Sequence, residues 1–339
     1  MFSKKIGIDL GTANSLVYLA GEGVVLNEPT VVAVTLEDKR VVAVGSEAKD
    51  MLGRTPGNIV ASRPMKDGVI ADYQITEAML AYFINKVAGK RRVFKPDVMV
   101  CVPSGCTQVE RRAVVDATLA AGARAVYLIE EPLAAAIGAQ IPIANPSGNL
   151  IVDSGGGSTE AAVISMGGVV AHASVRMSGN KLDEIIATYI RKKYNLIIGE
   201  RTAEEVKIHL GDALPDDKAK EKSMEVRGRD AFSSLPRVSS VTVDEVNKAI
   251  SPILNQMISA IKNVLEQTPP ELAADIVDKG IVLSGGSALL KNLDKLVTRQ
   301  IGVAAVIAED PMLCVVRGTG VALENLELYK KSIKSDRAY

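Results

Sequence analysis

The sequence contains no tryptophan and few aromatic residues of any kind. Aromatic residues make up 4% of its 339 residues, and 40 Lys and Arg balance 40 Asp and Glu, for a formal net charge of zero. Proteins that hold single strands use aromatic stacking platforms, and nucleic-acid binding in general needs a basic surface. The composition therefore predicts a protein that binds no nucleic acid.

Cysteine and histidine are equally scarce. The three cysteines, Cys101, Cys106 and Cys314, form neither a Cys-x-x-Cys pair nor an even set. We therefore expect reduced, mostly buried thiols, as in a cytosolic protein. The two histidines, His172 and His209, are too few for a histidine-rich metal site.

Long apolar runs are missing as well. The N-terminus passes from Lys4 and Lys5 directly into a short predicted strand, without the apolar stretch of a signal peptide. No run reaches the roughly 18 apolar residues that a membrane-spanning helix needs. We expect a protein that is soluble, or that contacts membranes only at their surface.

What the sequence does contain is an alternation of strand and helix signals, which is typical of an α/β protein. The length predicts about two domains, and 47% apolar residues suffice for large cores. Strands are predicted within Lys5–Ala20, Val31–Val44, Asp97–Pro103, Ala125–Ile129, Leu150–Val170 and Gly280–Leu283, and helices over Thr107–Ala121, Glu131–Gly138, Lys181–Tyr194 and Pro252–Gln267.

Two helix starts and one irregular segment are predicted in the second half. Thr202 with Glu205, and Thr242 with Glu245, have the spacing of capping boxes. Between them, residues 215–240 are polar and rich in Gly, Ser and charge, which favours a loop-dominated segment.

A weak internal repeat divides the chain near its middle. IGIDLGTANSLVYL and LIVDSGGGSTEAAVI share a strand, an Asp, a Gly-containing turn and a second apolar strand. Their aspartates, Asp9 and Asp153, lie 144 residues apart. Two similar halves would place both turns and both carboxylates face to face across a cleft.

Turns built from Gly, Ser and Thr present backbone N–H groups and hydroxyls, which suit phosphate oxygens. An Asp at the end of the leading strand can hold a hydrated Mg²⁺. One such turn would simply close a hairpin, but two matched turns favour a nucleotide.

Other phosphate-binding motifs are absent. The sequence has no G-x-x-x-x-G-K-[ST] and no kinase HRD or DFG triplet. Gly318 and Gly320 stand at a predicted strand-to-helix transition but lack the third glycine of a dinucleotide-binding turn. P-loop NTPases, dinucleotide-binding enzymes and protein kinases are therefore excluded.

Glu130 and Glu131 precede Pro132 at a predicted strand-to-helix junction. A carboxylate there can orient a water for attack on a phosphate. From spacing alone, an acidic helix start stabilised by the helix dipole is the favoured interpretation.

Six segments together carry a resemblance that extends over essentially the whole chain. The chain resembles the actin, heat-shock chaperone and sugar-kinase superfamily, and within it the MreB family of bacterial actins. The resemblance implies an actin-like fold: two similar halves, each a β-sheet flanked by helices with a small inserted subdomain, and the nucleotide in the central cleft. The segments are DLGTAN at 9–14, EEPLAAAIG at 130–138, DSGGGSTE at 153–160, GERTAEEVK at 199–207, GIVLSGGSALL at 280–290 and VVRGTGVALEN at 315–325.

The same resemblance implies four subdomains. Subdomain IA would comprise residues 1–32, 65–145 and 311–339, with IB inserted at 33–64. Subdomain IIA would comprise residues 146–180 and 245–310, with IIB inserted at 181–244.

The resemblance also assigns ATP and Mg²⁺ to the cleft and gives roles to individual residues. Asp9 and Asp153 would hold Mg²⁺ through water, and Glu131 would position the attacking water, with Asp153 and Ser158 completing the catalytic set. The remaining nucleotide contacts would be Gly11, Thr12, Ala13 and Asn14 in the first phosphate loop, Gly155, Gly156, Gly157 and Ser158 in the second, Gly179, Glu204 and Lys207 around the adenosine, and Gly285, Gly286 and Ser287 on the adenine side. The alternative for Glu204 and Lys207 is an exposed ion pair one helical turn apart.

Four positions depart from the family pattern. Ser287 stands where the family usually has a third glycine, Ser158 where it has Thr, and Asn180 where it has Asp. Ser154, inside the second phosphate loop motif, is also untypical.

Residues 89–97, GKRRVFKPD, place Val93 and Phe94 among four cations. An apolar pair ringed by positive charge suits the surface of an anionic membrane, and the resemblance associates this loop with membrane binding. Met1 and Phe2 would form a second contact. The alternative is that Val93 and Phe94 pack beneath their own loop.

The resemblance implies a slow ATPase that polymerises with itself on the inner face of the cell membrane. Its partners would be shape-determining membrane proteins of the wall-synthesis machinery, and its role would be rod-shape determination from a cytoplasmic, peripheral position. The alternatives are a plasmid-segregating actin and a solitary small-molecule kinase with the actin fold. A chaperone ATPase would need a peptide-binding region beyond the ATPase part.

Overall fold

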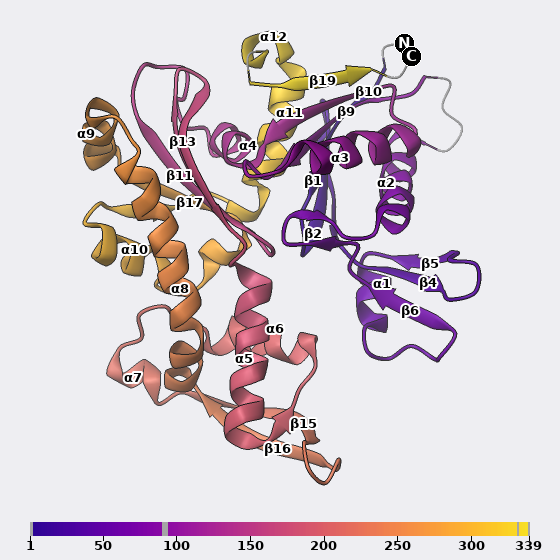
Figure 1. Cartoon of the computed structure of the whole chain (residues 1–339), viewed down its shortest axis with the longest axis vertical. Coiled ribbons are helices and arrows are strands. Elements are labelled where there is room, and N and C mark those ends of the chain that lie inside the picture. Colours follow the sequence, from indigo (N-terminus) through magenta and orange to yellow (C-terminus); the bar gives the residue numbers. More distant parts are fainter. Residues whose placement is uncertain (1–2, 90–93, 331, 338–339) are drawn as a thin grey trace.

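The computed structural model describes residues 3–89, 94–330 and 332–337. Figure 1 shows two large sheets with helices against them and two smaller sheets that project from the same end of the molecule. The first large sheet has the order β19-β10-β9-β1-β2-β3. Its strands are β1 (Lys5–Leu10), β2 (Asn14–Leu19), β3 (Gly23–Pro29), β9 (Asp97–Val102), β10 (Ala125–Glu130) and β19 (Lys334–Arg337), with α2 (Tyr73–Ala88), α3 (Gln108–Ala120), α4 (Glu131–Gly138), α11 (Cys314–Glu324) and α12 (Leu326–Tyr329).

The second large sheet has the order β13-β12-β11-β17-β18. In each large sheet, three strands that are consecutive in the chain pair antiparallel: β1, β2 and β3 in one sheet, and β11, β12 and β13 in the other. On its other side, the first strand of each set pairs with a parallel strand, β9 beside β1 and β17 beside β11. The sequence repeat is thus confirmed as a repeat of sheet topology. The strands are β11 (Asn149–Ser154), β12 (Thr159–Ser165), β13 (Gly168–Val175), β17 (Ile281–Ser284) and β18 (Ala305–Ile307), with α8 (Val243–Glu266), α9 (Pro270–Lys279), α10 (Leu293–Ile301) and the 3-10 turns η1 (Gly286–Leu289) and η2 (Pro311–Leu313).

Two small units complete the chain. One follows β3 and contains a three-stranded sheet and α1; a two-stranded ribbon, β7 with β8, follows it. The other lies between β13 and α8. The first unit and ribbon contain β4 (Val32–Thr35), β5 (Val41–Val44), α1 (Ser46–Met51), β6 (Ile59–Ser62), β7 (Met65–Lys66) and β8 (Val69–Ile70); the second unit contains α5 (Gly179–Tyr194), β14 (Leu196–Ile197), α6 (Glu200–Leu210), α7 (Asp217–Lys220), β15 (Ser223–Asp230) and β16 (Pro236–Thr242).

The two halves share a core in which α4 and α11 pack between the large sheets. A Cβ on Gly138 would lie 1.8 Å from the carbonyl oxygen of Cys314, and one on Gly318 would lie 1.8 Å from that of Ala134. Only glycine permits this backbone approach. Gly318 and Gly320 both lie inside α11. The prediction of a strand-to-helix transition at these glycines is therefore wrong.

Three further expectations need correction or extension. Helix α6 begins at Glu200, after Gly199, so Thr202 lies inside the helix and caps nothing. Residues 215–240 form α7 and a hairpin of β15 with β16 rather than a mainly irregular loop. The prediction failed because cross-strand pairing is not visible in composition. The Thr242 capping box is confirmed. Helix α8 runs from Val243 to Glu266, with Pro252 inside it, so it begins before the predicted start at Pro252.

The sulfur chemistry agrees with the sequence. All three cysteines are free; Cys101 and Cys314 are buried and Cys106 is partly exposed. Among the described residues, no helix combines the length and apolar character needed to cross a membrane.

Candidate functional site

The two predicted phosphate loops meet in the structure. A Cβ built on Gly156 would lie 2.5 Å from the Cβ of Ala13, and one on Gly157 would lie 2.3 Å from Oγ1 of Thr12. Oγ1 of Thr12 also accepts a hydrogen bond from the Gly68 N–H, at 2.9 Å. The turns after β1 and β11 thus face each other directly, as the repeat predicts.

The repeated aspartates lie at the ends of their strands beneath these loops. Burial, together with the charge of Asp153, raises the pKa of Asp9 to about 7, although a hydrogen bond from the Cys101 thiol at 3.3 Å opposes the rise. Burial raises the pKa of Asp153 to about 6, while the Ser284 hydroxyl, 2.7 Å from Oδ1, opposes the rise. The two carboxylates therefore belong to one electrostatic site.

Glu131 begins α4 at the same place. Burial, followed by the charges of Glu160, Asp153 and Asp9, raises the pKa of Glu131 well above its usual range. Glu131, expected to position water, is thus close enough to both aspartates to share their field.

Glu160 is a fourth carboxylate of this cluster, and sequence reasoning gave it no role. It pairs with Asp153 across β11 and β12, is fully buried, and accepts hydrogen bonds from the Ser174 hydroxyl and, at 3.3 Å, from the Ser104 N–H. Burial raises its pKa to about 7. Its place at the end of DSGGGSTE, next to the loop, was the available signal.

This cluster of four carboxylates is suited to a hydrated divalent cation. The main influences on the four pKa values are burial, repulsion between carboxylates and hydrogen bonds. In the part of the chain that the structure describes, no three His, Cys, Asp or Glu side chains converge closely enough to bind a metal directly. Carboxylate oxygens are the ligand type that Mg²⁺ takes in proteins, usually with several waters retained, so Asp9 and Asp153 could hold it through water.

The adenine-side residues lie against the second phosphate loop. The Ser287 hydroxyl donates to the Gly155 carbonyl at 2.7 Å, and the Gly179 N–H donates to the same oxygen at 3.2 Å. Gly285 has a φ of 82°, and a Cβ there would lie 2.3 Å from the Ser154 carbonyl oxygen. Gly286 is exposed beside them. Predicted nucleotide residues from three distant segments are therefore brought together.

Glu204 and Lys207 are held by different partners. Lys207 donates to Asp183 Oδ2 at 2.9 Å and to the Gly179 carbonyl at 3.1 Å. Glu204 Oε2 accepts from Lys49 at 2.8 Å, from the other half of the molecule. The alternative of an ion pair between Glu204 and Lys207 is therefore wrong.

Two further ion pairs accompany Lys49 and Glu204 between the small units. Arg201 lies 3.3 Å from Asp50, and Arg63 lies 3.7 Å from Glu200. These residues come from α6 on one side and from α1 and the end of β6 on the other. Sequence reasoning had no signal for them, because each pair joins residues more than 130 positions apart.

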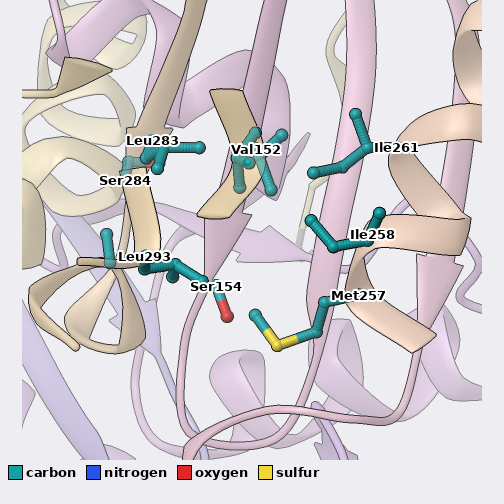
Figure 2. Close-up of a pocket in the computed structure, with 10 residues that line it drawn as sticks. Val152, Ser154, Met257, Ile258, Ile261, Leu283, Ser284 and Leu293 are labelled. Carbon is teal, nitrogen blue, oxygen red and sulfur yellow. The ribbon is translucent and has the colours of Figure 1, made fainter. Parts of the chain in front are cut away.

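An apolar cavity lies behind the second phosphate loop, between β11, β17 and α8. Figure 2 shows the Ser154 side chain extending toward Met257, with Val152, Leu283 and Ile258 nearby. Its lining contains no charged residue. This cavity belongs to the core of the second half and is not a nucleotide site.

The predicted membrane loop is described only in part. Val93 lies outside the described residues, as do Met1 and Phe2. Phe94 is 58% exposed, so it does not pack beneath its own loop. The Ser3 hydroxyl donates to the Lys95 carbonyl at 2.6 Å, which places the start of the chain beside this loop.

Comparisons of the sequence with known proteins identify its family. The family model of the MreB/Mbl protein matches residues 3–331. The chain is 50% identical to the cell shape-determining protein Mbl of Bacillus cereus, over 98% of this chain and 99% of the relative. It is 51% identical to the cell shape-determining protein MreB of Escherichia coli, over 99% of this chain and 98% of the relative.

Solved structures extend this agreement to the fold. MreB5 of Spiroplasma citri bound to AMPPNP superposes with a TM-score of 0.90 at 36% identity, over 98% of this chain and 99% of that one. A MamK double helical filament has a TM-score of 0.80 at 21% identity, over 95% of this chain and 99% of that one, and it shows the shared fold. The actin-like fold is thereby confirmed, and the chain belongs to the MreB/Mbl protein family.

Proposed function

We propose that this protein is an actin-like cytoskeletal ATPase that binds ATP and Mg²⁺ and assembles into filaments that determine cell shape. The observation that carries the proposal is the meeting of the two phosphate loops beside Asp9, Glu131, Asp153 and Glu160, whose pKa values are all raised, mainly by loss of contact with water. Phosphates bound by the loops bring Mg²⁺ with them, and that charge offsets the cost of removing the carboxylates from water. The S. citri relative bound to AMPPNP supports nucleotide binding.

Each half contributes a defined part of the chemistry. Backbone N–H groups of residues 11–14 and 156–158 would hold the phosphates, whereas the Gly155 N–H already donates to the Ser158 carbonyl at 3.1 Å. Asp9 and Asp153 would hold Mg²⁺ through water, and Mg²⁺, when bound, neutralises charge on the phosphates. Glu131, acting with Asp153 and the Ser158 hydroxyl, orients the attacking water, since phosphoryl transfer depends mainly on positioning and charge neutralisation.

The assembly and its location are parts of the same proposal. The protomer has the predicted subdomains IA, IB, IIA and IIB around the cleft, and polymerises with further copies of itself. It lies in the cytoplasm on the inner face of the membrane, where exposed Phe94 and the cationic loop at 90–95 contact anionic lipid. Filaments there direct wall synthesis through shape-determining membrane proteins.

Sedimentation with Mg²⁺ and ATP, ADP or no nucleotide, with phosphate release followed in the same tubes, tests the proposal. We expect pelleting in ATP with slow phosphate release. Glu131→Gln should pellet without releasing phosphate, whereas Asp153→Asn should lose both, because it removes a carboxylate from the Mg²⁺ site. Glu271→Gln, an exposed position on α9, is the matched control.

The competing kinase function predicts a different result. A protein that stays soluble with and without anionic liposomes, and consumes ATP only when a small-molecule acceptor is added, would be an actin-fold kinase. That outcome would remove the filament proposal.

A further inference from the structure

A chain of buried hydroxyls lies behind the second phosphate loop. Oγ of Ser154 is 2.9 Å from Oγ1 of Thr159 and 3.0 Å from Oγ of Ser178. All three side chains are at most 2% exposed. Ser287, from the distant η1 turn, joins the far end of the chain, with its Oγ 3.4 Å from that of Ser178. Two of these four residues, Ser154 and Ser287, are departures from the family pattern.

The hydroxyl chain ends on one carbonyl. The Gly155 oxygen accepts hydrogen bonds from the Ser178 hydroxyl, from the Ser287 hydroxyl at 2.7 Å and from the Gly179 N–H at 3.2 Å. Thr159 donates its own proton to the Met177 carbonyl at 2.7 Å, and Ser178 donates its own to the Gly155 carbonyl. The single Ser154 proton can therefore be donated to Ser178 or to Thr159, but not fully to both. A carbonyl oxygen has two lone pairs, so the three donors on Gly155 more than satisfy it.

Anchoring this oxygen fixes the direction of the next N–H. The peptide unit is planar and trans, so the Gly155 carbonyl and the Gly156 N–H point in opposite directions. The carbonyl points to the serines, and therefore the N–H points away from them. Gly156 is also the residue that meets Ala13 of the first loop. Glycine backbones otherwise sample a wide range of conformations, which binding would have to restrict.

We propose that Ser154, Ser178 and Ser287 are positioning residues for the phosphates of the nucleotide: Ser178 and Ser287 hold the Gly155 carbonyl, Ser154 supports Ser178, and together they pre-orient the Gly156 N–H toward a phosphate oxygen. The inference rests on the proposed function, since it assumes that phosphates bind at this loop. Pre-orientation raises affinity by removing the ordering cost from the binding step. Ser287 makes this restraint a feature of this chain, where the family pattern has glycine.

Affinities of the full-length protein for ATP, ADP and adenosine, measured by calorimetry with Mg²⁺, test the inference. Ser287→Ala should weaken ATP and ADP about threefold to tenfold, the range for one hydrogen bond. Adenosine affinity should not change, because adenosine has no phosphate. Ser287→Thr, which keeps the hydroxyl, should restore ATP affinity. Ser251→Ala removes a similar hydroxyl–carbonyl bond within α8, to Asn247, and is the matched control.

The outcomes separate this inference from the proposed function. Equal losses for ATP and adenosine would indicate either general destabilisation or a lost contact with the adenosine, and would overturn the role in positioning the phosphates. Wild-type ATP affinity in Ser287→Ala and Ser154→Ala would also overturn it, while leaving nucleotide binding intact. A wild-type protein that binds no ATP would overturn both. Should Ser154→Ala fail to fold, Ser287→Ala still decides, because Ser287 is partly exposed.

Discussion

The two halves of the molecule hold their phosphate loops in related but unequal ways. In the first half, the Thr30 hydroxyl, which follows β3, donates to the Gly11 carbonyl at 2.6 Å and lies 2.8 Å from the Ser15 hydroxyl. In the second half, Ser178 follows β13 and donates to the Gly155 carbonyl, as Thr30 does to the Gly11 carbonyl. Ser287 and the Gly179 N–H donate to the Gly155 carbonyl as well.

The difference follows from the residues of the loops themselves. The first loop contains Thr12, Ala13 and Asn14, whose side chains already restrict the backbone. The second contains three consecutive glycines at 155–157, which have far more conformational freedom to restrict. A repeated topology thus needs more external hydrogen bonds wherever its loop has fewer side chains.

The largest expected effect concerns the two matching aspartates and pH. Burial raises the pKa of Asp9 from 3.8 to about 7 and that of Asp153 to about 6. Between pH 4 and about 7 the folded protein keeps a proton that the unfolded chain has lost, so stability falls as pH rises through this window. At about 1.4 kcal/mol per pKa unit, Asp9 accounts for at most about 4 kcal/mol.

Denaturant unfolding of the nucleotide-free protein at pH 5 and pH 8 measures this effect. Asp9→Asn should remove more of the pH dependence than Asp153→Asn, because the pKa of Asp9 is raised further than that of Asp153. Equal slopes in the two variants and in the wild type would contradict the prediction.

Gly156→Ala should have the next largest effect, because it forces the two loops apart. Its Cβ would lie 2.5 Å from that of Ala13 and 3.1 Å from the Ala13 nitrogen, so we expect a loss of about 2–3 kcal/mol of unfolding free energy. Gly155→Ala is the matched control, since no atom lies within 4 Å of the added Cβ. Similar melting temperatures for the two variants would show that the loops do not touch in solution.

Thr30→Val and Ser287→Ala compare the two anchors directly. Thr30 is fully buried, and valine has a similar shape but no hydroxyl. Thr30→Val would therefore remove the hydrogen bonds to the Gly11 carbonyl and the Ser15 hydroxyl, at a cost of about 2 kcal/mol in unfolding free energy. Ser287→Ala leaves Gly155 with two other donors and should cost about 0.5–1 kcal/mol. Chemical denaturation measures both, and a larger loss for Ser287→Ala would reverse the comparison.

The smallest effect is expected where the two small units meet. The Lys49–Glu204 pair is about one-third exposed, and the Asp50–Arg201 pair is mostly exposed. Such pairs contribute about 0.2–1 kcal/mol and weaken with salt. Lys49→Gln should therefore speed nucleotide release about twofold to threefold at low salt, measured by stopped-flow fluorescence.

Lys248→Gln is the control for this prediction, because its partner Asp244 lies on the same helix. Equal release rates for Lys49→Gln and the wild type at low salt would mean that the ion pair does not affect the nucleotide site.

Sequence reasoning succeeded where the signal lies within a short stretch of chain. The turns at Asp9 and Asp153, the capping box at Thr242 and the helix start at Glu131 were all predicted, because strand alternation and capping depend on neighbours only a few residues away.

It failed where partners are distant. The glycines at 318 and 320 resembled a turn, yet they lie in a helix whose partner α4 lies about 180 positions earlier. Lys49 carried no local signal, and Glu160 carried only its place at the end of DSGGGSTE, because the importance of Glu160 comes from the other carboxylates and that of Lys49 from the opposite unit. Residues 215–240 pair as strands despite a polar composition, since hairpin pairing satisfies the backbone rather than burying side chains.

Local sequence patterns were enough to locate most strands, helices and phosphate-binding turns, and the motifs indicated the family. Folding was needed to show that the two turns touch, that Glu160 joins the carboxylates of the site, and that serines from two distant segments hold one carbonyl. The difference lies in how far apart the interacting residues are in the chain: hydrogen-bonded turns and apolar periodicity depend on residues that are close in sequence. Desolvation, charge repulsion and the aim of a peptide group depend on atoms that only folding brings together.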